Sequence, residues 1–129
     1  MKKAFLAILM ALFAVHAQAA TIVVAAADSG EAARRTASIV CDGEGDQAEI
    51  NGAIARLPEA GGTVLLLAGT YSIKRIEGEL GGVLIKRSNV TLAGEGPGTK
   101  LVLAAKQDTN VIRILGSGVG NIVIRDLYV

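Results

Sequence analysis

The second half of the chain, from residue 61 to residue 129, alternates short aliphatic and β-branched runs with Gly, Asn, Ser and Asp. Short β-branched runs that are bounded by turn-forming residues predict β-strands. The runs span residues 63–67, 71–73, 83–86, 90–93, 100–103, 111–115 and 122–129. Several of them are apolar throughout, which is typical of strands that are covered on both faces, as in parallel sheets.

These runs recur along the chain at similar intervals. Asn89 and Asn121 each precede a β-branched run, and the run at Val64 is followed by a similar run at Val90. A second series has runs that begin at residues 83 and 111. The two interleaved series predict coils of about 26 to 32 residues whose equivalent strands stack in parallel. We therefore expect an all-β chain, a right-handed parallel β-helix of about two coils.

One amphipathic helix is expected before these strands, at about residues 46–57. Asp46 is the expected N-cap, and Glu49 three residues later completes a pair that is similar to a capping box. No clear period marks residues 28–35. The first rung of a β-helix exposes unpaired backbone groups, so we expect residues 20–60 to form an N-terminal cap over it. The apolar stripe of the helix consists of Ile50, Ala53, Ile54 and Leu57.

Residues 1–19 have the three parts of a secretory signal peptide. They begin with Lys2 and Lys3, continue with an apolar run at 4–15, and end with a small-residue cleavage site at Ala19. The apolar run is too short to span a bilayer. The sequence therefore predicts a secreted or periplasmic protein that has no membrane association after cleavage.

Cleavage after Ala19 would remove two of the 13 basic residues and none of the 12 acidic ones, which leaves a formal charge of −1. This balance excludes a strongly basic nucleic-acid-binding protein. Cys41 is the only cysteine, so a small domain held together by disulfides within the chain is excluded as well.

Three segments together resemble the opening of a known superfamily. Residues 42–54 (DGEGDQAEINGAI), 61–71 (GGTVLLLAGTY) and 88–96 (SNVTLAGEG) resemble the pectate-lyase-like superfamily (pectin lyase fold), whose secreted members are right-handed parallel β-helices. Those proteins often begin with an acidic loop containing Gly, a capping helix, Gly-Gly-x-Val and a Pro-x-Gly-x-Tyr turn. Ala68 replaces the Pro of that turn here. The resemblance covers residues 41–129 and is more specific for fold than for activity.

The resemblance implies that the full protein acts on or binds an acidic polysaccharide. In the enzymes of the superfamily, which are lyases, glycoside hydrolases or epimerases, the catalytic groups generally lie several coils further on. An active site is therefore expected beyond residue 129, and this chain alone is expected to be inactive. The alternative is a noncatalytic surface or adhesin β-helix that binds carbohydrate. A third alternative is that the product of signal cleavage is complete, as an oligomer.

The end of the sequence favours the first two alternatives over the third. Residues 122–129 are an expected strand with no turn or covering helix after it. We therefore expect the N-terminal part of a truncated β-helix, which can associate with itself through its open last coil.

Carboxylates occur in two patterns that could carry chemistry. Asp42, Glu44 and Asp46 alternate in a way that suits Ca²⁺, but the segment lacks the Gly and the final Glu of an EF-hand loop, and a turn is the better interpretation. Glu77 and Glu79 flank Gly78 in an expected loop, where their spacing fixes no geometry. The remaining candidates, which lie one per strand or turn, are Glu95, Asp108 and Asp126.

Other residue types give structural interpretations. Cys41 has no histidine to activate it, because His16 lies in the signal peptide, and a buried thiol is expected. The Gly-rich segments 94–98 and 116–120 match no phosphate-binding loop and predict turns. Asn89 and Asn121 are expected to stack at equivalent turns and to share amide hydrogen bonds. No catalytic, cofactor-binding or metal-binding residue is predicted, and no cofactor.

Overall fold

The computed structural model describes residues 20–129, so the predicted signal peptide lies outside the described residues. Short strands make up most of the regular structure, and two helices lie between the first strands. The elements are β1 (Ala20–Ala25), α1 (Glu31–Thr36), β2 (Ile39–Val40), α2 (Gln47–Arg56), β3 (Gly62–Leu66), β4 (Gly69–Ile73), β5 (Gly81–Ile85), β6 (Val90–Ala93), β7 (Thr99–Leu103), β8 (Asn110–Ile114) and β9 (Ile122–Arg125). The predicted all-β character is confirmed.

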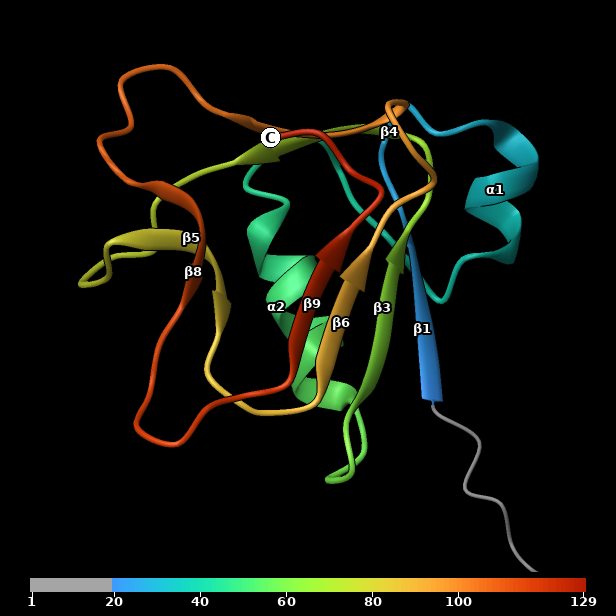
Figure 1. Ribbon diagram of the computed structural model, residues 1–129. Coiled ribbons are helices and arrows are strands. Elements are labelled where there is room, and N and C mark those ends of the chain that lie inside the picture. Colours follow the sequence, from blue (N-terminus) through green and yellow to red (C-terminus); the bar gives the residue numbers. More distant parts are fainter. Residues whose placement is uncertain (1–19) are drawn as a thin grey trace, which may run out of the picture.

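All of the strand pairing within the described residues is parallel, and it forms three sheets. The largest sheet has the order β2-β1-β3-β6-β9, and the two others are β4-β7 and β5-β8. In Figure 1, β1, β3, β6 and β9 lie side by side, β5 and β8 lie at the left, and β4 lies at the top. Successive strands along the chain therefore belong to different sheets, and the chain returns to each sheet after passing through the other two.

The strand register gives the length of each return. Gly62 of β3 pairs with Val90 of β6, and Val90 in turn pairs with Ile122 of β9. In the second sheet, Gly69 of β4 pairs with Thr99 of β7, and the β5-β8 ladder has a similar step. Each return therefore takes about 30 residues, a repeat length that is typical of stacked coils. The steps agree with the interval predicted from the sequence.

Two of the predicted alignments are wrong in detail. Val64 pairs with Leu92, not with Val90, and in this register Gly61 packs so closely against Asn89 that a Cβ on Gly61 would lie 2.0 Å from the Asn89 carbonyl oxygen. Val83 pairs with Ile112, one residue later than predicted. The predicted register would have placed Arg113 opposite the buried Ile85, on the inner face of the sheet.

The core lies between the three sheets and is almost entirely aliphatic. Tyr71 is its largest side chain and is fully buried, and its hydroxyl lies 2.8 Å from the Leu67 carbonyl oxygen and 3.0 Å from that of Val24. These contacts satisfy the only polar group of the ring. The fully buried aliphatic residues around it include Val24, Ile50, Val64, Leu66, Ile73, Val83, Ile85, Val90 and Leu92.

Helix α2 confirms the predicted helix to within one residue at each end, and the predicted apolar stripe is buried. Asp46 stands at the predicted N-cap position, but the predicted side-chain capping does not occur. Asp46 itself has helical backbone angles, and its side chain caps no helical N–H group. Its carboxylate accepts hydrogen bonds from the backbone N–H groups of Gly43 (2.9 Å) and Ser72 (2.8 Å). The sequence pattern did not indicate α1, a short helix without buried residues.

Side chains from the N-terminal segment bind the free edges of β4 and β5. Every second N–H group of β4 and its extension points away from β7, and each of these groups meets a side-chain oxygen at 2.8 Å. The donor and acceptor pairs are Thr70 with Asp28, Ser72 with Asp46, and Lys74 with Gln47. On β5, the Asn51 amide accepts from the Leu84 N–H group (2.9 Å) and donates to the Gly82 carbonyl (3.0 Å). The first strands of both sheets are thus hydrogen-bonded on each side.

The last strands of two sheets, β8 and β9, are paired on one side only within the described residues. Tyr128 partly covers β7, since its N–H group donates to the Thr99 carbonyl (2.8 Å) and its own carbonyl accepts from the Leu101 N–H group (2.9 Å). Ile114 of β8 is 47% exposed and Ile124 of β9 is 39% exposed, although both continue inward-facing rows. Within residues 20–129, no helix has the length and apolar character that crossing a bilayer requires.

The stacking of Asn89 on Asn121 is confirmed. The Asn121 side-chain N–H donates to the Asn89 side-chain oxygen at 2.8 Å. Both residues have positive φ angles, 62° and 56°, a conformation that Asn tolerates better than most residues. The two turns are therefore equivalent, as their recurrence in the sequence predicts.

Candidate functional site

A cavity of about 430 Å³ lies between the outer side of α2, the β4–β5 loop and the outward face of β5. Its volume falls in the range of small-molecule binding sites. Most of the lining is apolar and comes from Ile54, Ala55, Ile76 and Leu84. The charged side chains of the lining are Glu77, Glu79, Lys86 and Arg87. The structure thus brings both carboxylates of the predicted Glu77–Glu79 pair to one cavity, which their sequence spacing could not establish.

Basic groups surround Glu79 at the edge of this cavity. The Lys86 ammonium donates to the Glu79 carboxylate at 2.8 Å, and the Arg75 guanidinium donates to the Glu79 carbonyl at 2.7 Å. The hydrogen bond and the charge of Lys86, with a smaller effect of Arg113, hold the pKa of Glu79 below its ordinary value. Arg113 pairs with Leu84 in the β5-β8 ladder, so it lies on the same outward face. We call Arg75, Lys86 and Arg113 the basic cluster.

Arg87 closes the end of the cavity at the C-terminus of α2. Its guanidinium donates to the carbonyls of Leu57 (2.9 Å), Ile54 (3.3 Å) and Pro58. A cation at this position complements the partial negative charge of the last helical carbonyls. Glu77 is exposed and makes no hydrogen bond or ion pair with residues 20–129.

A second cluster lies in the loop before α2, which contains the alternating carboxylates of residues 42–46. Asp42, Glu44 and Asp46 do not converge there, since the Asp42 carboxylate accepts from the Glu44 N–H group (2.8 Å) in a local turn. Ligand-type atoms of Cys41, Asp46 and Glu49 instead lie within 4.8 Å of one another. The sequence missed this group, because no metal-ligand motif has this spacing.

The chemistry of this second cluster favours a structural role. Burial, and then the charges of Asp46, Glu49 and Asp42, raise the pKa of the Cys41 thiol to about 12, so the thiol stays protonated. The thiolate rather than the thiol is the nucleophile, so the raised pKa argues against nucleophilic chemistry at Cys41. Both oxygens of Asp46 already accept backbone N–H groups. The prediction of a buried Cys41 is confirmed.

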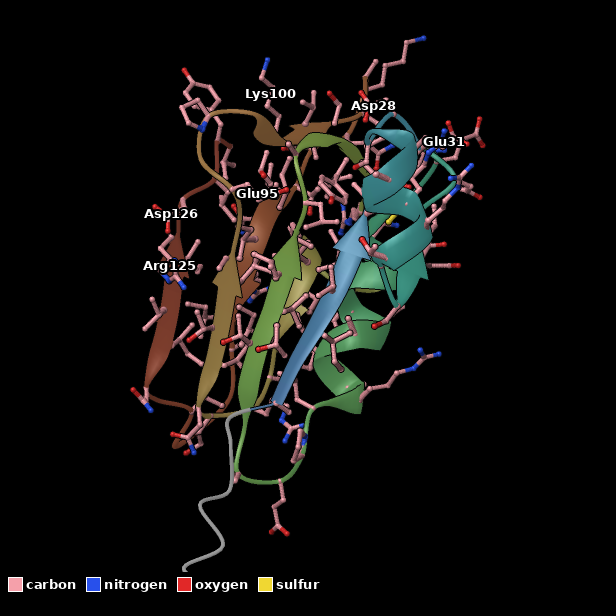
Figure 2. All side chains as sticks on the ribbon, turned by 90° about the vertical axis from the view of Figure 1, so that its right-hand side faces the viewer. Asp28, Glu31, Glu95, Lys100, Arg125 and Asp126 are labelled. Atoms are coloured by element: carbon pink, nitrogen blue, oxygen red, sulfur yellow. The ribbon has the colours of Figure 1, made fainter. Side chains whose placement is uncertain are left out.

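The remaining carboxylates lie apart from one another. Asp28, Glu95 and Asp126 follow the carboxyl ends of β1, β6 and β9, and Figure 2 shows them spread along this edge of the large sheet. The Glu95 carboxylate accepts from the Ala68 N–H group (2.7 Å), and Asp126 pairs with Arg125 (2.5 Å). Asp108 is exposed between β7 and β8. Within the described residues, these groups form no paired acid and base.

The two Gly-rich segments are turns, as predicted. Gly94 packs against the Asp126 carbonyl oxygen, 2.3 Å from where its Cβ would lie, and the Gly96 N–H group donates to the same carbonyl (2.7 Å). Gly116 and Gly118 have positive φ angles, in the connection between β8 and β9. Neither segment leads into a helix that could hold an anion at its N-terminus.

No family model matches this chain, and neither the curated proteins nor the solved structures include a match. The resemblance to the pectate-lyase-like superfamily thus stays a prediction from the sequence.

Proposed function

We propose that residues 20–129 form the first coils of a right-handed parallel β-helix, and that residues 20–60 are its cap. The parallel ladders, in which the chain returns to each of three sheets at similar intervals, support the coil arrangement. The side-chain hydrogen bonds of Asp28, Asp46, Gln47 and Asn51 to the free edges of β4 and β5 support the cap. A capped edge does not pair with other chains, which is the purpose of a cap.

We further propose that the protein acts on an acidic polysaccharide, and that this chain contributes a binding wall. The basic cluster carries the proposal. Its three cations gather on the outward face of β5 and β8 and the adjoining loop, around Glu79, and the other carboxylate that lines the adjacent cavity is Glu77. The local charge is therefore positive, although the chain without residues 1–19 has a formal charge of −1. Polyanions associate with such a patch.

Catalytic chemistry is proposed to lie beyond residue 129, as in the resembling lyases, hydrolases and epimerases. Asp28, Glu95 and Asp126 lie apart along one edge of the large sheet, Glu79 is paired with Lys86, and burial raises the pKa of the Cys41 thiol. The noncatalytic alternative uses the same wall for adhesion.

Binding of polygalacturonate to the full chain tests the proposal, with isothermal titration calorimetry at low salt and neutral dextran as the control polymer. We expect saturable binding of polygalacturonate that weakens with added salt, and no binding of dextran. Arg113→Gln should weaken binding about two- to fivefold, since one half-buried charge at the surface contributes modestly. Arg34→Gln removes an exposed charge from α1 and should have no effect.

Equal binding of both polymers, or equal effects of the two substitutions, would refute the role of the basic cluster. Release of new reducing ends or unsaturated products by this chain would refute the placement of the active site.

A further inference from the structure

The cavity beside α2 differs from the basic cluster in the ligand that it suits. Its floor consists of the aliphatic side chains of Ile54, Ala55, Ile76 and Leu84. A sugar ring presents hydroxyl groups that need polar partners or an aromatic platform, and this lining contains no aromatic residue. The floor therefore suits an apolar body rather than a polysaccharide chain.

The charges around the cavity favour an anion over a cation. Lys86 and Arg87 both line it and follow one another at the end of β5. Lys86 uses one ammonium N–H on Glu79, which leaves two further donors. Arg75 and Arg113 add positive charge next to Glu79, so the cations at and beside the cavity, four with Lys86 and Arg87, outnumber the two carboxylates of Glu77 and Glu79.

We propose that this cavity binds a small organic carboxylate with an apolar body. The carboxylate of the ligand accepts hydrogen bonds from the Lys86 ammonium, and the nearby positive charge of Arg87 adds to the attraction. The apolar body of the ligand lies on the aliphatic floor. Most small-molecule sites combine an apolar lining with a few polar groups in this way. The inference does not depend on the polysaccharide proposal, because it concerns a different ligand, which would lie inside the cavity and not across the outward face of β5 and β8.

Three probes of the same shape test the charge of the ligand. We expect 3-phenylpropionate to bind more tightly than neutral 3-phenylpropanol, and 3-phenylpropylammonium to bind most weakly. Binding is measured on the full chain by ¹H–¹⁵N NMR titration, in which the amides of Ala55, Ile76 and Leu84 should shift. A second readout is calorimetry at the same pH.

Matched substitutions test the residues. Lys86→Gln should weaken binding of 3-phenylpropionate about three- to fivefold, whereas Lys100→Gln, at an exposed position on β7, should leave it unchanged. Glu77→Gln should strengthen binding of the anion about twofold, because it removes a like charge at the rim. Ala55→Leu should fill the cavity and abolish binding of all three probes, and Ala48→Leu, an exposed position on the same helix outside the lining, should not.

Tighter binding of the ammonium probe would overturn the charge assignment, as would equal effects of Lys86→Gln and Lys100→Gln. Absence of shifts at the lining amides with every probe would overturn the site itself. Thermal unfolding of each variant keeps these results separate from a loss of fold.

Discussion

The two ends of the strand stack are built from the same kinds of strand but differ in what covers them. At the N-terminal end, Asp46 and Asn51 occupy the free edges of β4 and β5 with side-chain oxygens. At the other end, Ile114 and Ile124 are 47% and 39% exposed. Their partners one rung below, Ile85 and Leu92, are fully buried. The burial of an inward-facing residue therefore depends on whether another strand of the same sheet follows and covers it, more than on its own residue type.

This difference shows how a polar segment can take the place of a strand. A carboxylate or amide oxygen at the right position accepts a hydrogen bond from a backbone N–H group that would otherwise donate to a carbonyl of a neighbouring strand. The N-terminal segment needs no strand geometry to do so, since Asp46 belongs to a loop and Asn51 to a helix. Substitutions at the two ends should therefore lower the free energy of unfolding by different amounts.

The largest effect is expected for Asp46→Ala. The substitution leaves the N–H groups of Gly43 and Ser72 without their acceptor, at a fully buried position. Unsatisfied buried groups cost about 1–3 kcal/mol each, so the free energy of unfolding should fall by about 3 kcal/mol. Asp108→Ala, at an exposed position between β7 and β8 in the last part of the stack, should cost about 0.5 kcal/mol or less. Urea unfolding measures both, and equal losses would contradict the proposed difference between the ends.

A smaller effect is expected for the asparagine on α2. Asn51→Ala removes one donor and one acceptor from the edge of β5, and the free energy of unfolding should fall by about 1–2 kcal/mol. Asn110→Ala is the matched control on β8, where the side chain makes one exposed hydrogen bond to the Leu80 carbonyl (3.0 Å). Its cost should be about 0.5 kcal/mol. The same unfolding series tests the pair, and a larger loss at Asn110 would reverse the comparison.

The stability contributed by the turn at Asn121, whose side chain is hydrogen-bonded to Asn89, should depend on the backbone conformation that the residue can adopt. Asn121→Ala removes the hydrogen bond to Asn89 and places Ala at a φ angle of 56°, so a loss of about 1 kcal/mol is expected. Asn121→Gly removes only the hydrogen bond, because Gly adopts positive φ freely, and should cost less. If the Gly variant is as unstable as the Ala variant, the backbone contribution is absent and the stacked amides account for the whole effect.

The smallest effects concern pH, and two carboxylates of the N-terminal part of the stack, Asp46 and Glu79, should contribute to stability with opposite pH dependence. Burial raises the pKa of Asp46, so its contribution favours folding most at pH below the ordinary aspartate pKa and is lost as pH rises through the raised value. Lys86 lowers the pKa of Glu79, so its contribution is present above the ordinary glutamate pKa and is lost as pH falls. NMR titration of the two carboxyl groups measures both directions, and a lowered pKa at Asp46 would contradict the role of burial.

Much of the architecture could be predicted from the sequence, because it rests on local patterns. Short β-branched runs predicted the strands, and the i, i+3, i+4, i+7 stripe predicted α2. The spacing of Asn89 and Asn121 predicted their hydrogen bond. The exact register could not be predicted, since it depends on the close approach of Gly61 to Asn89 and on keeping Arg113 off the inner face.

The candidate site could be predicted less well, because it depends on contacts between distant segments. Glu77 and Glu79 were singled out, but nothing in their spacing indicated that α2 and β5 would complete a cavity around them. Asp46 was expected to cap its own helix, yet its carboxylate reaches Ser72, which lies 26 residues away in the sequence. A hydrogen bond between segments so far apart in the sequence depends on the three-dimensional fold of the chain.

Amide hydrogen exchange, measured residue by residue by NMR, tests the central claim most directly. That claim is that side chains replace a strand along the edge of β4, whereas the last strands have an open edge. The account predicts slow exchange at Ser72 and Lys74, although no strand pairs with that side of β4, and fast exchange at Ile114 and Ile124, whose N–H groups point away from the neighbouring strand. Exchange at Ser72 and Lys74 that is as fast as at Ile114 and Ile124 would contradict it.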